Sequence, residues 1–454
     1  MYDFLIIGAG VIGTSIAREL SKYNVNTCIL EKTDDVSNGA SKANSGIVHG
    51  GYAAKFGSLK GNLCFLGNQM FKSLNEELNF GYRKTGGLVL AFNANELKEL
   101  NNLFENGKKF GLKNLKILEK KEILKIEPNI NKEVMFALYC PDVGVTSPYE
   151  YTIALAENAI ENGTELFLNS EVLAIKEYKD HFEVITKNKT FKTKYLINAA
   201  GVYADKISSM LGINTFKIIP RKGEYILFEK GTGSIVNNVI FQVPTKKGKG
   251  ILVTSTYHGN LMIGPNAEEV ENKENTKTSE EMLTYIIETA KKSVPFFDMK
   301  KKLKTFSGIR PTPNTGDFII EESKERFINV AGIESPGLTS SPAIAKYVLE
   351  ILKKSIHLEK KKNFNPYRKP IIKQKTLTPK ELKNLINIKS SNEKIICRCE
   401  QVTEGEILDT LNRNIPIKTV KAIKMRTRAG MGRCQGAFCK PRVEEVIKKF
   451  IEKK

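Results

Sequence analysis

Four of the seven cysteines in this chain lie near its C-terminus in two closely spaced pairs. Cys397 and Cys399 are separated by one residue, and Cys434 and Cys439 by four. Four converging thiolates provide soft sulfur ligation, which in a reducing compartment suits zinc or an iron–sulfur cluster. The spacing alone does not distinguish these two centres. The other cysteines lie in apolar surroundings and are predicted to be core thiols: Cys28, Cys64 and Cys140.

Three glycines near the N-terminus have the spacing of a dinucleotide site. Gly8, Gly10 and Gly13 follow an apolar run and open an Ala/Leu-patterned helix. The first glycine allows the strand-to-helix turn, the second lets the backbone approach a pyrophosphate, and the third lets the helix lie close to the sheet. Glu31 ends the next apolar run, where a carboxylate can hold ribose hydroxyls. The motif therefore predicts a bound dinucleotide.

The segment 41–52 is rich in small and polar residues, where a nicotinamide-binding fold would usually continue with another strand. This N-terminal region resembles the D-amino-acid-oxidase superfamily of FAD enzymes. Within that superfamily it is most similar to glycerol-3-phosphate dehydrogenases and then to L-2-hydroxyglutarate dehydrogenases. Further stretches carry the same resemblance: 57–60, 198–201, 258–266, 308–311 and 337–343. The resemblance spans most of residues 1–355.

The resemblance implies that the dinucleotide is FAD. Residues at the positions of its FAD site are Gly8, Gly10, Gly13, Glu31, Ser41, Asn44, Ser45, Gly46, Val172, Gly201, Gly337, Leu338 and Thr339. The last three precede a predicted helix whose N-terminal amides would stabilise the negative charge that develops on a reduced flavin.

Two histidines and one arginine are the predicted catalytic residues. Oxidation of a secondary alcohol requires loss of the hydroxyl proton, a task that suits neutral imidazole. The resemblance places both His49 and His258 near the flavin; alternatively, each only orders its loop, and in some relatives the residue at the first position is covalently attached to the flavin. Arg310 lies where relatives bind the acidic group of the substrate, with a structural salt bridge as the alternative. Arg221 and Lys222 are a weaker second pair of cations.

The segment 426–436 resembles the bacterioferritin-associated-ferredoxin type of 2Fe–2S domain. Its glycines would let backbone amides reach the cluster sulfurs, and its arginines would offset the cluster charge. The resemblance favours a 2Fe–2S cluster on the four C-terminal cysteines, with zinc as the alternative.

We predict an α/β FAD-binding Rossmann-like domain interleaved with an α+β antiparallel-sheet substrate domain, followed by a small C-terminal helical iron–sulfur domain. A helix over 342–353 should close the FAD module, and Pro366, Pro370 and Pro379 should interrupt the basic segment after it. The predicted parts are an FAD-binding domain at 1–75, 146–215 and 301–356, a substrate domain at 76–145 and 216–300, a linker at 357–394 and a 2Fe–2S domain at 395–454.

The chain is strongly basic, with 71 Lys and Arg against 50 Asp and Glu and a net charge of +21. Its lysines are spread among glutamates and do not alternate with aromatic residues, so the pattern does not predict nucleic-acid binding. An anionic lipid surface or an anionic substrate is the alternative use of this charge. No apolar run is long enough to span a bilayer and no leader is evident, so we expect a cytoplasmic protein, or one attached peripherally at the inner face of the membrane.

These features predict an FAD dehydrogenase that oxidises sn-glycerol 3-phosphate to dihydroxyacetone phosphate. Electrons would pass through the 2Fe–2S domain to an external acceptor protein or quinone, because an oxidase would need no thiolate-bound relay. The alternatives are an L-2-hydroxyglutarate dehydrogenase, an FAD-dependent amino-acid oxidoreductase, and a flavin and iron–sulfur electron carrier without a substrate. Arg310 and His258 argue against the carrier. The oligomeric state is left open.

Overall fold

The computed structural model describes residues 1–244, 250–388 and 390–453. It divides into two compact units, Met1–Asn365 and Pro366–Lys454. The first unit contains both the predicted FAD-binding domain and the predicted substrate domain. Five residues of the predicted substrate segment 216–300, at positions 245–249, lie outside the described residues.

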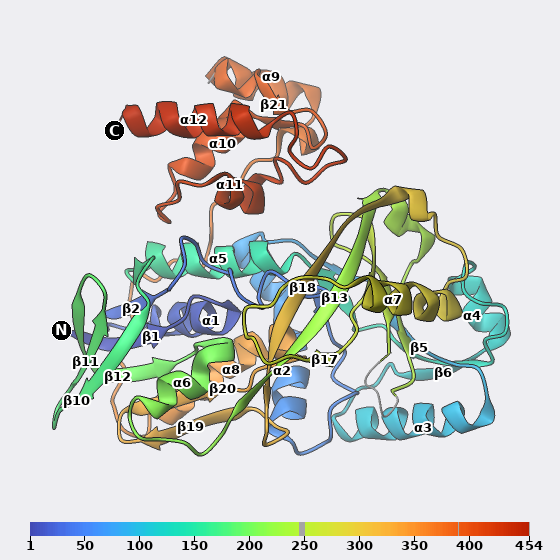
Figure 1. The fold of residues 1–454 in the computed structure, drawn as a ribbon, viewed down its shortest axis with the longest axis horizontal. Coiled ribbons are helices and arrows are strands. Elements are labelled where there is room, and N and C mark those ends of the chain that lie inside the picture. The colour runs from blue at the N-terminus through green and yellow to red at the C-terminus, as the bar shows by residue number, and fades with distance from the viewer. Residues whose placement is uncertain (245–249, 389, 454) are drawn as a thin grey trace. The chain divides into compact units, whose positions relative to one another are not determined.

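The first of two large sheets contains the N-terminal strand (Figure 1). Its main strands have the order β10-β11-β12-β1-β2-β9, with β20 paired to β12 and β19 paired to β20. Strand β1 is parallel to β2 and β12, and β12 is parallel to β20, so their carboxyl ends meet at one edge of the sheet. The bounds are β1 Tyr2–Ile7, β2 Thr27–Leu30, β9 Glu165–Phe167, β10 Val172–Glu177, β11 Phe182–Thr186, β12 Thr190–Asn198, β19 Ile319–Lys324 and β20 Phe327–Ala331.

Helices α1, α2, α5 and α8 pack together beside this sheet. Helix α8 contacts both α1 and α2, and α5 contacts α1. Helix α8 begins at Gly337, five residues before the predicted start at Pro342. Proline has no N–H to donate to the carbonyl of Leu338, and the hydroxyl of Ser341 donates to it instead at 2.9 Å. The bounds are α1 Val11–Leu20, α2 Leu59–Leu78, α5 Pro148–Glu161 and α8 Gly337–Leu352.

The second large sheet is mostly antiparallel. Its order is β17-β13-β16-β15-β14-β5-β7-β6, and β18 pairs with β13 as two long neighbouring strands (Figure 1). The predicted FAD-binding segment 301–356 is corrected here, because residues 302–313 form β18 and belong to this sheet. The bounds are β5 Gly87–Ala91, β6 Lys116–Glu119, β7 Phe136–Cys140, β13 Ile218–Lys230, β14 Val239–Gln242, β15 Leu252–Ser255, β16 Asn260–Gly264, β17 Glu268–Glu269 and β18 Lys302–Pro313.

Shorter elements complete the first unit. Strands β3 and β4 pair with β8 in a small sheet, and helix α7 packs on β13, β15 and β16. The apolar core of the second sheet includes Ile226, Ile240, Ile263 and Ile286, all fully buried. The bounds are β3 Ile47–Val48, β4 Tyr82–Lys84, β8 Gly144–Thr146, α3 Ala94–Lys109, α4 Lys120–Ile126, α6 Ala204–Ser209 and α7 Glu280–Ser293.

The second unit is a small helical domain around a two-stranded sheet. Helix α9 begins at Pro379 and lies inside the segment predicted as linker, because its apolar residues recur at helical spacing. Helices α10, α11 and α12 contact one another, and Thr403 caps α10 through the N–H of Glu406. Across the described parts of both units, no helix is long and apolar enough to cross a membrane. The bounds are α9 Pro379–Ile388, β21 Ile395–Cys397, β22 Val402–Thr403, α10 Glu404–Leu411, α11 Val420–Thr427 and α12 Lys440–Glu452.

Candidate cofactor and active site

A cavity of about 1640 Å³ runs along the carboxyl edge of the parallel strands in the first unit. Many residues of the predicted FAD site line it: Gly8, Gly10, Glu31, Ser41, Asn44, Ser45, Val172, Gly201, Gly337 and Leu338. Gly13, Gly46 and Thr339 are not among its described lining residues. The fold therefore brings ten of the thirteen predicted residues to the surface of one cavity, and the other three do not line it.

The first helix is held against the sheet by its glycines. Gly8 has a φ of +103°, and a Cβ there would lie 2.6 Å from the carbonyl oxygen of Ala199. A Cβ on Gly13 would overlap the carbonyl oxygen of Gly8, so Gly13 serves helix–sheet contact. The N–H of Val11 donates to the hydroxyl of Ser41 at 2.8 Å. The N-terminus of α1 thus faces the cavity, as a pyrophosphate site requires.

Glu31 presents a fixed carboxylate at the end of β2. Its Oε2 accepts a hydrogen bond from the N–H of Ala9 at 2.9 Å. Its Oε1 accepts from the N–H of Thr33 at 3.0 Å and from the hydroxyl of Thr33 at 2.8 Å. The side chain is 9% exposed and lines the cavity. A carboxylate held in this way can accept hydrogen bonds from ribose hydroxyls.

His49 lines the cavity, and its backbone is fixed on both sides. Its N–H donates to the hydroxyl of Thr339 at 2.9 Å, and its carbonyl oxygen accepts from the side-chain amide of Asn68 at 2.8 Å. Thr339 lies in the first turn of α8, so the helix N-terminus and the imidazole are held at one end of the cavity. Thr339 therefore positions His49 rather than lining the site itself.

His258 is placed elsewhere. Its Nε2 lies 3.1 Å from Oε1 of Glu150, a residue in the first turn of α5. The cavity's lining, over the residues that the structure describes, does not include it. The described lining thus includes His49 and not His258, whose ring lies beside a hydrogen-bond partner on α5.

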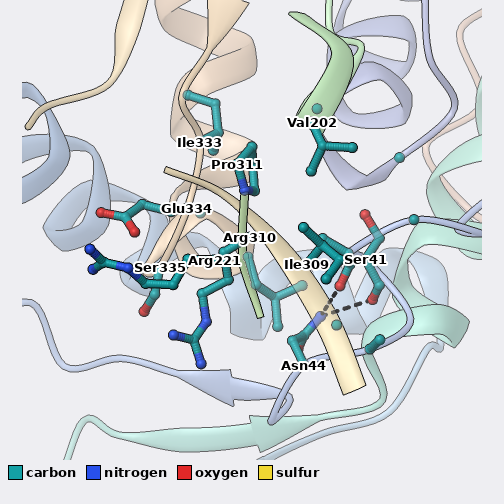
Figure 2. A pocket seen from close by; sticks show the side chains of 18 of the residues that line it. Ser41, Asn44, Val202, Arg221, Ile309, Arg310, Pro311, Ile333, Glu334 and Ser335 are labelled. Carbon is teal, nitrogen blue, oxygen red and sulfur yellow. Dashed lines mark hydrogen bonds between the residues drawn. The ribbon is translucent and has the colours of Figure 1, made fainter. Parts of the chain in front are cut away.

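Arg310 extends into the cavity from β18 (Figure 2). Its Nη2 donates to the carbonyl oxygen of Asn266 at 3.1 Å. It forms no ion pair with any carboxylate among the described residues, so the salt-bridge alternative has no support. Its charge remains available to an anion in the cavity.

Arg221 and Lys222, the second pair of predicted cations, lie in different surroundings. Arg221 lies opposite Arg310 in the β13–β18 register, lines the same cavity, and pairs with Glu269 at 2.9 Å (Figure 2). Lys222 is buried and pairs with Glu224 at 2.9 Å and with Glu268 at 3.3 Å. Lys222 is thus part of a structural ion-pair network, and the expectation that it serves the substrate is corrected.

Sequence reasoning missed an ion pair in the wall of the cavity. Nζ of Lys60 lies 2.8 Å from Oε1 of Glu334, whose Oε2 accepts from the hydroxyl of Thr312 at 3.0 Å. The backbone N–H groups of Leu59 and Lys60 each donate to the carboxylate of Asp317 at 2.8 Å. These partners are more than 250 positions apart in the chain, so no local pattern could pair them.

The four C-terminal cysteines lie in two pairs in the second unit. Sγ of Cys399 is 3.6 Å from Sγ of Cys434. Burial and the neighbouring thiol of Cys397 raise the pKa of Cys439 to about 12, which identifies the second pair. Hydrogen bonds from the backbone of Gly436, Phe438 and Ala437 lower the pKa of the Cys434 thiol.

This pairing fits a centre with two metal atoms. Two thiolates on one tetrahedral metal lie roughly 3.8 Å apart, given metal–sulfur bonds of about 2.3 Å. Two thiolates for each of two irons is the ligand set of a 2Fe–2S cluster.

One predicted role of the arginines near the cysteines is corrected. Nε of Arg428 donates to Oε2 of Glu400 at 3.0 Å, and both side chains are buried. Although burial raises the pKa of Glu400, the hydrogen bonds and charge of Arg428 outweigh it and hold that pKa at about 2. Arg428 thus neutralises a neighbouring carboxylate instead of offsetting cluster charge.

Comparison with known proteins agrees with both sites. Residues 3–351 match the model of the FAD dependent oxidoreductase family. The chain belongs to this family. Residues 395–449 match the BFD-like 2Fe-2S binding domain. FAD and a 2Fe–2S cluster are accordingly the cofactors of this oxidoreductase, and the residues described above fit both.

Individual relatives cover one or both units. The chain is 50% identical to a glycerol 3-phosphate dehydrogenase of Caloramator mitchellensis over 98% of this chain and 94% of that protein. It is 37% identical to a glycerol 3-phosphate oxidase of Mycoplasma genitalium over 80% of this chain and 97% of that protein. The FAD-bound structure of L-alpha-glycerophosphate oxidase from Mycoplasma pneumoniae superposes with a TM-score of 0.78 at 32% identity, covering 82% of this chain and 99% of the other.

Proposed function

We propose that this oxidoreductase converts sn-glycerol 3-phosphate to dihydroxyacetone phosphate. The observation that carries the proposal is Arg310, a cation without a described carboxylate partner, in the same cavity as His49. A guanidinium fork binds a phosphate bidentately, and an imidazole at the same site can take the hydroxyl proton. The similarity to glycerol 3-phosphate dehydrogenase and oxidase supports the same substrate.

A second guanidinium, already paired with Glu269, lies beside Arg310. Arg221 faces Arg310 across two paired strands and lines the same cavity. Both glycerol 3-phosphate and L-2-hydroxyglutarate are dianions, so charge alone does not rank them. Glycerol 3-phosphate is placed first because of the similarity to glycerol 3-phosphate dehydrogenase and oxidase.

Each part of the cavity has a proposed role in holding FAD. The N-terminus of α1 with Ser41 holds the pyrophosphate, and Glu31 holds ribose hydroxyls. Val172 and Gly201 border the adenosine end, while Gly337 and Leu338 present helix amides to the flavin. Gly13, Gly46 and Thr339 support this wall from behind, and Asn44 and Ser45 complete the flavin loop. Bound flavin supplies the acceptor for the hydride that leaves the alcohol carbon.

The second unit, which carries the four C-terminal cysteines, gives the electrons a route to an external acceptor protein or quinone. The dehydrogenase relative is matched over nearly all of this chain, whereas the oxidase relative is matched over 80% of it. An enzyme that discharges onto oxygen has no need of a thiolate-bound relay. We therefore propose that Cys397, Cys399, Cys434 and Cys439 bind the 2Fe–2S cluster and that it accepts the electrons one at a time.

Anaerobic mixing with candidate substrates tests this function. Glycerol 3-phosphate should bleach the flavin absorbance and then reduce the cluster absorbance. Bleaching by L-2-hydroxyglutarate and not by glycerol 3-phosphate would replace the substrate. Absence of bleaching with any hydroxy acid, polyol phosphate or amino acid would leave the electron-carrier function.

A further inference from the structure

We propose that the exposed surface beside the cluster cysteines docks an acidic electron-carrier protein. This inference rests on the proposed function, because it specifies the chemistry of the acceptor. We call this surface the cysteine face. It consists of Arg398, Cys399, Arg433, Phe438, Lys440 and Arg442, all exposed.

The two cysteine pairs differ in their access to solvent. Cys397 and Cys439 are buried, whereas Cys399 is exposed and Cys434 is half-buried. Cys399 also lies against the loop that precedes Cys434, because a Cβ on Gly432 would overlap the Cβ of Cys399. An electron carrier approaches the cluster over the shortest distance on the side of these two accessible thiolates. The cysteine face therefore surrounds the exit for electrons.

The cysteine face carries a net positive charge. Residues 397–403 and 430–442 include four exposed cations, and their one carboxylate, Glu400, is buried against Arg428. Nζ of Lys440 lies 3.9 Å from the carboxylate of Glu444, one turn along α12, so this cation is partly neutralised. The four exposed cations give the cysteine face a net positive charge, which attracts an acidic partner and raises the rate of encounter.

Phe438 provides an apolar contact within that cationic surface. Its side chain is 80% exposed, although its own backbone contributes to the hydrogen bonding of the Cys434 thiol. Exposed aromatic and arginine side chains are the residue types enriched at protein–protein interface centres. Binding to a lipid surface would call for a broader apolar face than one ring. The observations therefore favour a protein.

The electron count is simple. Oxidation of one alcohol to a ketone releases two electrons and two protons. A one-electron acceptor takes one electron in each encounter, so two acceptor molecules are reduced for each substrate molecule oxidised. No further oxidant is required.

Two haem proteins of opposite charge serve as probes, the acidic cytochrome b5 and the basic cytochrome c. The holoenzyme is reduced anaerobically with dithionite and mixed with either oxidised probe, and haem reduction is followed by stopped flow. The affinity between the oxidised holoenzyme and each probe is measured by calorimetry, a readout that needs no turnover. Dithionite bypasses the substrate, so failure of the glycerol 3-phosphate test would leave this test intact.

The variants reverse charge on the cysteine face or away from it. The double variant Arg398→Glu, Arg433→Glu is the main test, and Arg442→Glu is a second variant in case the first loses its cluster. Lys448→Glu is the matched control, since it lies nine residues beyond Cys439 on α12, or roughly 13 Å at 1.5 Å per residue. That separation from the cluster ligand exceeds the Debye length of about 10 Å at 0.1 M salt, so the control changes the field at the cluster little.

The expected result is a preference of the wild-type protein for the acidic probe, weakened by added salt. Charge reversal should slow reduction of the acidic probe and weaken its binding on the order of tenfold, while the control stays close to wild type. Equal responses to the two probes, or test variants that behave like the control, would overturn the proposal. Pelleting of the same proteins with anionic vesicles tests a lipid surface instead. If charge reversal abolished pelleting but left reduction of the acidic probe unchanged, the proposal would be overturned in favour of a lipid surface.

Discussion

The first unit builds its site from residues far apart in the chain, whereas the second builds its site from two short loops. His49 and Thr339 are 290 positions apart and are joined by a hydrogen bond of 2.9 Å. All four cluster cysteines lie between positions 397 and 439. The cavity therefore depends on the packing of the whole unit, while the cysteine centre depends mainly on local loop geometry.

The two sites also differ in how their charged side chains are paired. In the cavity, Arg310 has no ion-pair partner among the described residues, and Lys60 is matched by Glu334 in the wall. In the second unit, the buried Arg428 pairs with Glu400, whereas Arg398, Arg433, Lys440 and Arg442 near the cysteines are exposed. The first arrangement suits a small anion held inside the protein, and the second suits a partner at the surface. Variants that affect one site and spare the other test this comparison.

Loss of a cluster ligand should have the largest effect. Cys434→Ser removes a thiolate from the accessible pair, so we expect loss of the iron and of the cluster absorbance, with FAD still bound and still bleached by substrate. Iron and sulfide analysis with a visible spectrum measures this. Cys64→Ser, at a buried thiol of the first unit, is the control and should retain iron. Loss of flavin in Cys434→Ser would show that the two sites are not independent.

The two histidines should separate by their positions. His49→Gln should slow anaerobic flavin reduction by on the order of a hundredfold or more, because the cavity loses its proton acceptor. His258→Gln should have a small effect on that rate, since its imidazole is bonded to Glu150. Stopped-flow measurement at saturating substrate provides both rates. A larger loss in His258→Gln than in His49→Gln would reverse this assignment.

The sequence predicted those parts of the molecule that are encoded by local patterns. The glycine spacing at Gly8, Gly10 and Gly13 predicted the strand–turn–helix, and the FAD family and the 2Fe–2S domain were confirmed by comparison. Both recognitions depend on short local stretches, which for the FAD family recur along residues 1–355. The backbone roles that those spacings predicted are present in the glycine contacts.

Positions that depend on distant segments were not predictable in the same way. The family resemblance suggested His258 and residue type suggested Lys222, but carboxylates from other segments contact them: Glu150 lies within hydrogen-bond distance of His258, and Glu268 forms an ion pair with Lys222. The boundary at residue 301 was wrong because β18 continues the second sheet by pairing with β13. In each case, tertiary contacts rather than local pattern decide the outcome.

Changing the anion ligand should have an intermediate effect. Arg310→Lys keeps the charge and loses the bidentate fork. We therefore expect a lower kcat/KM for glycerol 3-phosphate, equivalent to a loss of about 1.5 to 3 kcal/mol of transition-state stabilisation. Arg221→Lys is the matched control and should cost less, because Arg221 already pairs with Glu269. Steady-state kinetics with an artificial acceptor measures both, and an unchanged melting temperature shows that folding is intact. Equal losses in the two variants would indicate that both arginines bind the phosphate.

The smallest expected effect is a pH dependence confined to the second unit. Burial raises the pKa of Glu406 from an ordinary value of 4.5 to about 7, while hydrogen bonds from Gln374 and Thr403 oppose the shift. A carboxyl with a raised pKa binds its proton more tightly in the folded state. Its contribution to stability is therefore complete below pH 4.5 and is lost as the pH rises through about 7.

Between about pH 6 and pH 8 this linkage predicts a fall of about 1 kcal/mol in the free energy of unfolding of the second unit. Glu406→Gln should flatten that slope, because the amide does not titrate, whereas Glu393→Gln at an exposed position should preserve it. Denaturant unfolding followed by cluster absorbance reports the second unit, and flavin fluorescence reports the first. The same slope in the flavin signal would mean that the two units unfold together, which would contradict the independence inferred from their separate packing.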